Sequence, residues 1–309
     1  MNPDPSRDPA AGRSLAAGEG PATPSHILSF DVEEYFQVEA AAGCVPRDRW
    51  DEMPRRLPAA VDRVLDLLAA GRASATFFIL GWVAARDRPL VRRIAQAGHE
   101  IASHGIDHRM IGRLTADQFR RSLADSRRLL EDITGRPVIG YRAPTFSLTR
   151  ATAWAIDALA DAGYQYDSSV FPVRHDRYGV PDAPRFAHRA VGPAGGSILE
   201  IPPLTLRLAG ANWPVGGGGY LRLLPVRIVA AALRSASRRG RQAMIYLHPW
   251  ELDPGQPVLP MGRLAAWRHR VNLAGTAAKL AWLLDRFTFT SVRASGLLPA
   301  PPDLASFAY

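Results

Sequence analysis

Short apolar runs alternate with helix-like segments along most of this chain, and this alternation restricts the fold more than any other feature. The runs that predict strands cover residues 26–30, 75–80, 100–103, 137–142, 198–201 and 243–247. Between them lie amphipathic stretches with capping residues, such as Thr115 followed by Gln118, the pattern of a capping box. Strands and helices at this spacing predict an α/β fold with a parallel sheet, open or closed into a barrel. The segment 167–225, rich in Pro and Gly, predicts long loops over the barrel mouth.

Polar residues follow several of the predicted strands. Asp31, His104, Arg142 and His248 all fall at or just after the end of an apolar run. In parallel α/β folds the chemistry sits at the carboxyl ends of the strands. We therefore expect these side chains to share one mouth.

Two histidines four residues apart are the strongest chemical signal. His104 and His108 stand in the run Ser-His-Gly-Ile-Asp-His directly after a predicted strand. Neutral imidazole is the commonest metal ligand in proteins, and this spacing lets two rings converge on one ion. The pair predicts a metal site that needs at least one further ligand.

Three acids near the first strand are candidates for that ligand. In an extended chain Asp31 and Glu33 point to the same side, while Glu34 faces away. Clustered acids repel one another unless a cation neutralises them. We expect Glu33 to bind the metal and Asp31 to act as general base, with Glu34 as the alternative ligand.

Arg142 and His248 complete the predicted site. A guanidinium at Arg142 can hold a catalytic carboxylate ionised and fixed in orientation. His248 lies at the end of its apolar run and can act as a general acid that protonates a leaving amine.

Composition limits the partners. The chain has 309 residues and a net charge of +9, almost all of it from arginine, with Lys279 the one lysine. These arginines are scattered and no nucleic-acid motif accompanies them, so we expect no nucleic-acid partner. Cys44 is single, no apolar run could span a membrane, and residues 1–25 read as a disordered tail. We expect a cytoplasmic protein.

The ordered motifs resemble the polysaccharide deacetylases of carbohydrate esterase family 4, the NodB-homology group. The resemblance covers residues 26–250 and rests on Phe30–Glu34, Ser103–His108, Tyr141–Pro144 and Tyr246–Pro249. It implies a distorted (β/α)7-type barrel and a divalent metal, usually zinc, held by one carboxylate and two histidines. Carried over by position, it implies that Asp31 is the base, His104 and His108 are metal ligands, Arg142 is the partner of the base and His248 is the acid.

One position departs from that family. The family usually has two adjacent aspartates, and Val32 occupies the place of the second one. This favours the variant group in which the second acid lies two residues after the first, at Glu33. Further motifs after Asp31, after His248 and around His269 resemble a subfamily from exopolysaccharide loci associated with exosortase and PEP-CTERM sorting. Such members carry a C-terminal extension, so we expect a barrel at 26–250 and an extension packed on it at 251–309.

The resemblance implies a metal-dependent hydrolase that removes N-acetyl groups from amino sugars of a polysaccharide. We expect Tyr141, Pro144, Trp213 and Trp250 to contact the glycan. A peripheral association with a polysaccharide-synthesis complex is a further expectation. Two alternatives stay open: an amidohydrolase of a cyclic imide or ureide, and a glycan-binding protein without catalysis.

Overall fold

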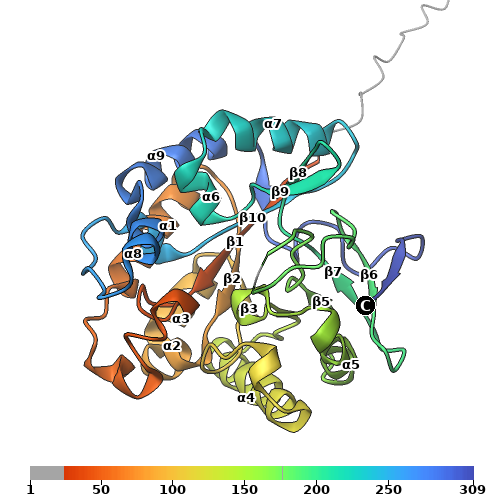
Figure 1. The fold of residues 1–309 in the computed structure, drawn as a ribbon, viewed down its shortest axis with the longest axis horizontal. Coiled ribbons are helices and arrows are strands. Elements are labelled where there is room, and N and C mark those ends of the chain that lie inside the picture. The colour runs from red at the N-terminus through yellow and green to blue at the C-terminus, as the bar shows by residue number, and fades with distance from the viewer. Residues whose placement is uncertain (1–23, 176) are drawn as a thin grey trace, which may run out of the picture.

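A parallel sheet forms the centre of the molecule, a computed structural model that describes residues 24–309 apart from residue 176 (Figure 1). The first strand, β1 (His26–Val32), is second in the order of this sheet. Its order is β10 (Met244–Leu247), β1, β2 (Thr76–Ile79), β3 (Glu100–Ser103), β4 (Gly140–Tyr141), β5 (Tyr166–Asp167) and β7 (Ser197–Glu200). All neighbours along this path are parallel, so their carboxyl ends meet at one end of the sheet.

The sheet closes into a ring where the chain leaves β7 and returns beside β10. Pro203 lies opposite Met244 in a parallel bridge, and the Leu204 N–H donates to the Met244 carbonyl at 2.8 Å. A second bridge joins Gly217 to Tyr246. Because single bridges make this closure and β4 and β5 span two residues each, the ring is irregular. The predicted distorted (β/α) barrel is confirmed.

Helices surround the ring (Figure 1). They are α1 (Leu57–Ala70), α2 (Gly81–Arg86), α3 (Arg88–Gln96), α4 (Ala116–Thr134), α5 (Trp154–Asp161), α6 (Gly218–Leu223), α7 (Val226–Ser237), α8 (Arg263–Arg270) and α9 (Leu273–Leu284). The predicted capping box of α4 is confirmed: Thr115 Oγ1 accepts from Gln118 N, and Gln118 Oε1 accepts from Thr115 N. The helix ends at Gly135, whose φ of 66° is the left-handed conformation that glycine adopts without strain.

Alternate residues of the strands fill the barrel interior. Ile27, Phe78, Ala102 and Met244 belong to one buried apolar cluster. Two and four residues beyond Ile27, Ser29 and Asp31 point the same way, because successive strand side chains alternate between faces. The interior is therefore apolar at mid-height and polar at the carboxyl end of β1.

The prediction of long loops over 167–225 holds for only part of the segment: the described residues from 168 to 187 form no helix or strand, whereas later residues form regular elements. This segment holds β6 (His188–Val191), which is antiparallel to β7, and a hairpin of β8 (Thr205–Leu208) with β9 (Ala211–Pro214). The hairpin turns through Ala209 and Gly210, both with positive φ. Strands of four residues are too short for a clear two-residue periodicity, which explains why the composition suggested loops.

The C-terminal residues add strands to the same sheet. β11 (Phe289–Thr290) pairs with β1, and β12 (Ser306–Ala308) pairs with β6. The division at residue 250 stays a proposal, and the predicted tail, except residues 24 and 25, lies outside the described residues. Among the described helices, none combines the length and apolar character needed to cross a membrane.

Candidate active site

The polar side chains that follow four strands converge at the carboxyl end of the barrel. Asp31 lies in β1 and Glu33 just after it, His104 follows β3, Arg142 follows β4 and His248 follows β10. The parallel register brings these strand ends side by side.

Glu33, His104 and His108 form the one group of three or more acidic, histidine or cysteine residues in the described chain that has metal-ligand geometry. One candidate ligand atom from each lies within 4.8 Å of the others. Oε2 of Glu33 is 2.7 Å from Nε2 of His108 and 3.6 Å from Nε2 of His104. All three side chains are buried. One carboxylate and two imidazoles leave coordination positions open for water and substrate, as in catalytic zinc sites.

Contacts behind the cluster hold the ring of His104 and the backbone turn that carries His108. Nδ1 of His104 lies 2.9 Å from the Arg142 carbonyl and donates to it, which leaves Nε2 unprotonated and free to bind a metal. His108 has a φ of 55°, a left-handed conformation that is strained for a residue with a side chain. Arg47 donates to the carbonyls of Asp107 and His108 and so stabilises this turn.

The buried carboxylate of Glu33 fits a cation. Oε2 accepts no hydrogen bond of acceptable geometry from any described residue, although His108 is close. A buried carboxylate oxygen without a donor is costly unless a cation neutralises it. Burial acts to raise the pKa of Glu33, but the charge of His108 and the nearby imidazole of His104 outweigh it and hold that pKa well below its usual range. The Glu33 carboxylate is thus kept ionised, as a metal ligand must be.

Asp31 and Arg142 form a buried ion pair beside this group. Nη1 of Arg142 donates to Oδ1 of Asp31 at 2.6 Å. The arginine is fully buried inside the barrel, where Nη2 also donates to the hydroxyls of Ser29 and Ser168 and Nε donates to the Ser168 carbonyl. The guanidinium is therefore fixed, and it fixes one oxygen of Asp31 while the other faces the mouth.

That second oxygen faces His248. Nε2 of His248 lies 3.9 Å from Oδ2 of Asp31 and 3.6 Å from Oε1 of Glu33. The His248 side chain is 20% exposed, whereas those of Asp31 and Glu33 are nearly sealed from solvent. The imidazole thus lies at the solvent side of the cluster, where a substrate would approach.

Two residues behind His248 set its charge. Nδ1 of His248 is 3.3 Å from Oε2 of Glu251, and Nε of Arg222 donates to Oε1 of Glu251 at 2.8 Å. Burial acts to lower the pKa of His248, but the hydrogen bond to Glu251 and the charge of Glu33 raise it to about 9. Burial acts to raise the pKa of Glu251, but Arg222 and His248 lower it to about 2. The chain Arg222–Glu251–His248 therefore favours a protonated imidazole.

The structure places Glu34 away from the metal-binding group. Its carboxylate accepts hydrogen bonds from the backbone N–H groups of Arg56 and Leu57 at the start of α1. Consecutive strand residues point to opposite faces, so Glu33 and Glu34 cannot both face the mouth. The role of alternative ligand therefore does not fit Glu34.

The four expected glycan contacts have different settings. The ring of Tyr141 is buried against Phe119 and Tyr164, so it cannot contact a substrate, and Pro144 is also buried. Trp213 is 56% exposed on β9. Trp250 is buried and stacks between the rings of His248 and His269. Among these residues, Trp250 alone touches a residue of the cluster.

Sequence reasoning missed the residues that support Arg142 and Glu251. Ser29 and Ser168 are hydroxyls inside strands or at their ends, and Arg222 is one of many arginines on helices. None carries a pattern of its own. The one signal that could have pointed to Ser29 is its position two residues before Asp31, on the same face of β1.

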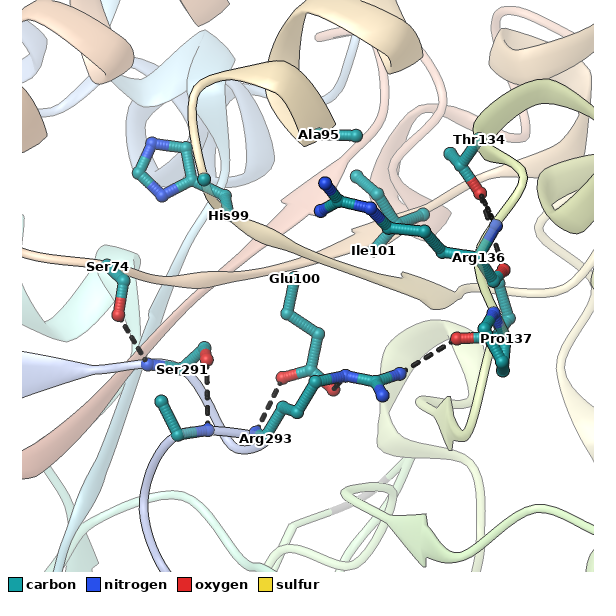
Figure 2. A pocket seen from close by; sticks show the side chains of 13 residues that line it. Ser74, Ala95, His99, Glu100, Ile101, Thr134, Arg136, Pro137, Ser291 and Arg293 are labelled. Atoms are coloured by element: carbon teal, nitrogen blue, oxygen red, sulfur yellow. Dashed lines mark hydrogen bonds and ion pairs between the residues drawn. The ribbon is translucent and has the colours of Figure 1, made fainter.

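A cavity of about 330 Å³ lies at the opposite end of the barrel, under the amino ends of the strands (Figure 2). Figure 2 shows Glu100 directed toward Arg293, which reaches the Pro137 carbonyl. Glu100 is satisfied by the Thr76 and Tyr166 hydroxyls and the Arg293 N–H. Metal-ligand geometry is absent there within the described chain, so the polar mouth is the better candidate for chemistry.

Comparisons with known proteins agree with this position. The sequence profile of the polysaccharide deacetylase family matches residues 49–166, and that of a domain of unknown function, DUF3473, matches residues 168–296. The peptidoglycan-N-acetylglucosamine deacetylase of Bacillus cereus is 29% identical over 108 residues, which are 35% of this chain and 49% of that protein. The peptidoglycan deacetylase of Helicobacter pylori is 30% identical over 140 residues, 43% of this chain and 47% of that protein. The chain spans about half the length of these curated relatives.

A solved structure extends the likeness to the whole fold. A protein of Mycobacterium smegmatis, provisionally described as a polysaccharide deacetylase, superposes with a TM-score of 0.55 at 22% identity, covering 86% of this chain and 87% of that chain. At this identity the likeness shows the fold. The chain is therefore similar to polysaccharide deacetylases over residues 49–166, the part that holds His104, His108 and Arg142, and similar to a solved structure in its overall fold.

Proposed function

We propose that this protein is a metal-dependent hydrolase that removes N-acetyl groups from amino sugars of a polysaccharide. The observation that carries this proposal is the convergence of two separate units at one mouth. One is the group Glu33, His104 and His108, and the other is the pair Asp31 and His248 with their buried partners. The first unit can hold a cation, and the second can take up and deliver a proton.

Asp31 acts as the general base in this proposal. The ion pair with Arg142 fixes the orientation of its carboxylate and leaves Oδ2 directed toward His248. A divalent cation bound by Glu33, His104 and His108 would polarise the acetamide carbonyl and lower the pKa of a bound water. Asp31 removes a proton from the attacking water while the water oxygen bonds to the carbonyl carbon.

His248 acts as the general acid. Its imidazole is held by Glu251 at Nδ1, and Nε2 faces the mouth. When the bond between the carbonyl carbon and the nitrogen breaks, Nε2 of His248 delivers its proton to the departing amine. The products are acetate and a free amino sugar, and the proton on Asp31 returns to His248 or to solvent.

The biological setting rests on the resemblance and on the relatives. The names of the relatives point to N-acetylated glycans, and the subfamily motifs after Asp31 and His248 favour exopolysaccharide synthesis. We propose zinc as the metal, because Glu and His are ligands that zinc accepts in hydrolytic sites. Action on a nascent or lipid-linked glycan at the cytoplasmic face, with peripheral association with the synthesis complex, completes the proposal. Cell fractionation that finds the enzyme outside the cytoplasm would contradict this last part.

The decisive experiment combines metal analysis with an acetate assay. The purified chain is loaded with zinc, its metal content is measured, and N-acetylglucosamine oligomers are offered with small cyclic amides as the comparison. We expect one metal per chain, acetate release from the oligomers and no turnover of the cyclic amides. A metal-loaded protein that releases no acetate from any N-acetylated glycan would overturn the proposal.

A further inference from the structure

Two acidic side chains outside the candidate site lie side by side where two strands end. Asp167 is the last residue of β5 and Glu200 is the last residue of β7, and the parallel register of these strands pairs the two residues directly. Paired residues of neighbouring strands project to the same face of a sheet. Both residues are 0% exposed. The fold therefore holds two fully buried carboxyl groups next to each other.

Each of these carboxyl groups has one oxygen with a donor and one without. Oδ1 of Asp167 accepts from the Ser169 hydroxyl, and Oε1 of Glu200 accepts from the Val170 N–H at 3.1 Å. Oδ2 of Asp167 and Oε2 of Glu200 have no hydrogen-bond partner among the described residues. A buried oxygen without a donor is costly, and two such atoms on paired side chains indicate that a proton lies between them.

No basic side chain of the described residues forms an ion pair with either acid. The groups that face the pair from the surrounding elements are Tyr141 of β4, Arg142 after β4, His188 of β6 and Tyr309 after β12. The guanidinium of Arg142 donates to Asp31, to Ser29 and to Ser168, and to neither member of the pair. Burial lowers the pKa of His188 to about 4, so this ring is neutral at pH 7.

The other neighbours carry no positive charge either. Burial raises the pKa of both tyrosines, Tyr141 and Tyr309, so their phenols stay neutral. On α5, Asp157 binds backbone N–H groups before the start of β7, at the far end of that strand. Burial and the charge of Asp167 raise the pKa of Glu200 well above its ordinary value. Two adjacent carboxyl groups without a cation between them do not both ionise, and a single proton supplies the donor that their free oxygens lack.

Hydrogen bonds connect this pair to the partner of the proposed base. The hydroxyl oxygen of Ser169, which donates to Asp167, accepts from the Ala143 N–H at 2.7 Å. Ala143 directly follows Arg142, whose guanidinium is held by the neighbouring Ser168. The backbone beside Arg142 is thus anchored to the carboxylate of Asp167.

We propose that Asp167 and Glu200 share one proton, and that the protonated pair positions Arg142 against the proposed base. The two acids are positioning residues, because they touch neither the metal-binding group nor the mouth. Loss of the proton would leave two negative charges side by side, and their repulsion would draw Asp167 away from Ser169 and loosen Arg142. The inference rests on the proposed function only for its effect on turnover, since the shared proton is a property of the folded chain.

The first test measures the unfolding equilibrium constant of the full, zinc-loaded chain in urea at pH 6, 7 and 8. Both acids are ionised in the unfolded chain over this range, so unfolding releases the shared proton and this release raises the constant tenfold per pH unit. Glu200→Gln places an amide N–H where the proton lies and removes the release. We expect the constant of the unsubstituted chain to rise about a hundredfold more between pH 6 and pH 8 than that of Glu200→Gln.

A second variant and a control accompany this measurement. Asp167→Asn supplies an amide donor from the other side of the pair and gives the answer if Glu200→Gln does not fold. Glu52→Gln, at a glutamate whose side chain is 60% exposed, should keep the pH dependence of the unsubstituted chain. Infrared spectroscopy at pH 7 should show the carbonyl stretch of one protonated carboxyl group that is present in the unsubstituted chain and in Glu52→Gln but is lost in both amide variants.

The second test measures acetate release from N-acetylglucosamine oligomers. Glu200→Ala removes the shared proton and should lower kcat about tenfold with KM within about twofold, because the base is oriented less well and no substrate contact is lost. Glu200→Gln should restore kcat at pH 7 to within about twofold of the unsubstituted chain. Ser169→Ala breaks the link to Ala143 and should lower kcat as Glu200→Ala does, whereas Ser197→Ala, at an exposed position, should not.

The outcomes separate this inference from the proposed function. Equal pH dependence of unfolding in the unsubstituted chain and both amide variants would overturn the shared proton, whatever the activity. Equal kcat for Glu200→Ala and Glu200→Gln, or an unchanged kcat for Ser169→Ala, would overturn the positioning of Arg142. Acetate release without the difference in pH dependence keeps the proposed function and removes the pair, whereas that difference without acetate release from any variant does the reverse.

Discussion

At the scale of the residue, Arg142 links the fold to the candidate chemistry. Each nitrogen of its guanidinium donates inside the barrel, to Asp31, to Ser29 or to Ser168, and its backbone carbonyl accepts from the ring of His104. One residue therefore orients both the proposed base and a proposed metal ligand. This double role requires that Arg142 be immobile, and its complete burial ensures this.

Loss of the arginine is expected to destabilise the protein strongly. Arg142→Met leaves the Asp31 carboxylate buried without its cation, which should cost about 3–5 kcal/mol in the free energy of unfolding. Urea denaturation measures the change. Arg136→Met, at an exposed arginine, is the control and should shift the free energy by less than about 0.5 kcal/mol. Equal, small shifts for both variants would show that Asp31 is not held as described.

The proposed roles of Asp31 and His104 make opposite predictions for metal and turnover. Asp31→Asn should keep the metal and lose about 10²–10⁴-fold in kcat, because it removes the base and no ligand. His104→Ala should lose metal and turnover together. Elemental analysis and acetate release, measured on the same samples, distinguish the two. An active Asp31→Asn enzyme would refute the assignment of the base.

The sequence predicts which residues form the site better than it predicts the side chains that surround and support them. Glu33 and Glu34 are adjacent acids, and the two-residue alternation of a strand favours Glu33 as the ligand but leaves Glu34 as the alternative. The supporting hydroxyls of Ser29 and Ser168 could not be predicted, because a serine that faces a buried guanidinium reads in sequence like any small strand residue. The ring of Tyr141 packs into the aromatic core beside α4, a setting that the sequence does not indicate.

At the scale of the element, the amino end of α6 fits closely against the residue behind His248. A Cβ atom placed on Gly218 would collide with the Glu251 carboxylate, whereas one on Gly219 would meet nothing closer than 3.8 Å. Glycine at 218 is thus required by the approach of the helix to Glu251. The neighbouring glycine is not under this restriction.

This contrast gives a matched pair of helix variants. Gly218→Ala should displace Glu251 from His248 and reduce kcat by about tenfold or more, because the acid loses the group that orients it. Gly219→Ala should have activity within about twofold of the unsubstituted chain. Steady-state kinetics on N-acetylglucosamine oligomers measure both. Similar activity of the two variants would contradict a positioning role for Glu251.

Elements with a strong local signal could be predicted, and those that depend on distant pairing could not. The predictions of a strand at 100–103 and of the capping box of α4 are confirmed, because apolar runs and caps are local properties of the sequence. β5 has two residues and exists because β4 and β7 lie on either side of it. Likewise, the β8–β9 hairpin owes its register to a turn through Ala209 and Gly210, which composition alone does not reveal.

At the scale of the whole molecule, buried histidines outside the site make folding sensitive to acid. Burial lowers the pKa of His26, His188 and His269 to about 4 each, against an ordinary value near 6.5. The unfolded chain therefore binds protons between pH 6.5 and pH 4 that the folded chain does not. The contribution of these histidines to the free energy of unfolding is therefore complete above pH 6.5 and is lost as the pH falls toward 4.

We expect each of these histidines to remove about 1–3 kcal/mol of unfolding free energy over that range. Urea denaturation at pH 7 and pH 5 measures the loss. His26→Gln should reduce the pH dependence, since Nδ1 of His26 accepts from the Ala243 N–H and cannot do so when protonated. His175→Gln, at an exposed position, should leave it unchanged. A free energy of unfolding independent of pH over this range would contradict the assignment.

The closure of the ring through Leu204 and Met244 has a consequence for the chain as it is made. Glu33, His104, His108, Asp31 and Arg142 all precede residue 143, whereas β10 and His248 emerge from the ribosome about a hundred residues later. A nascent chain therefore contains all three candidate metal ligands while one wall of the barrel is still missing. In the proposed mechanism the general acid, His248, comes only with the last strand of the ring.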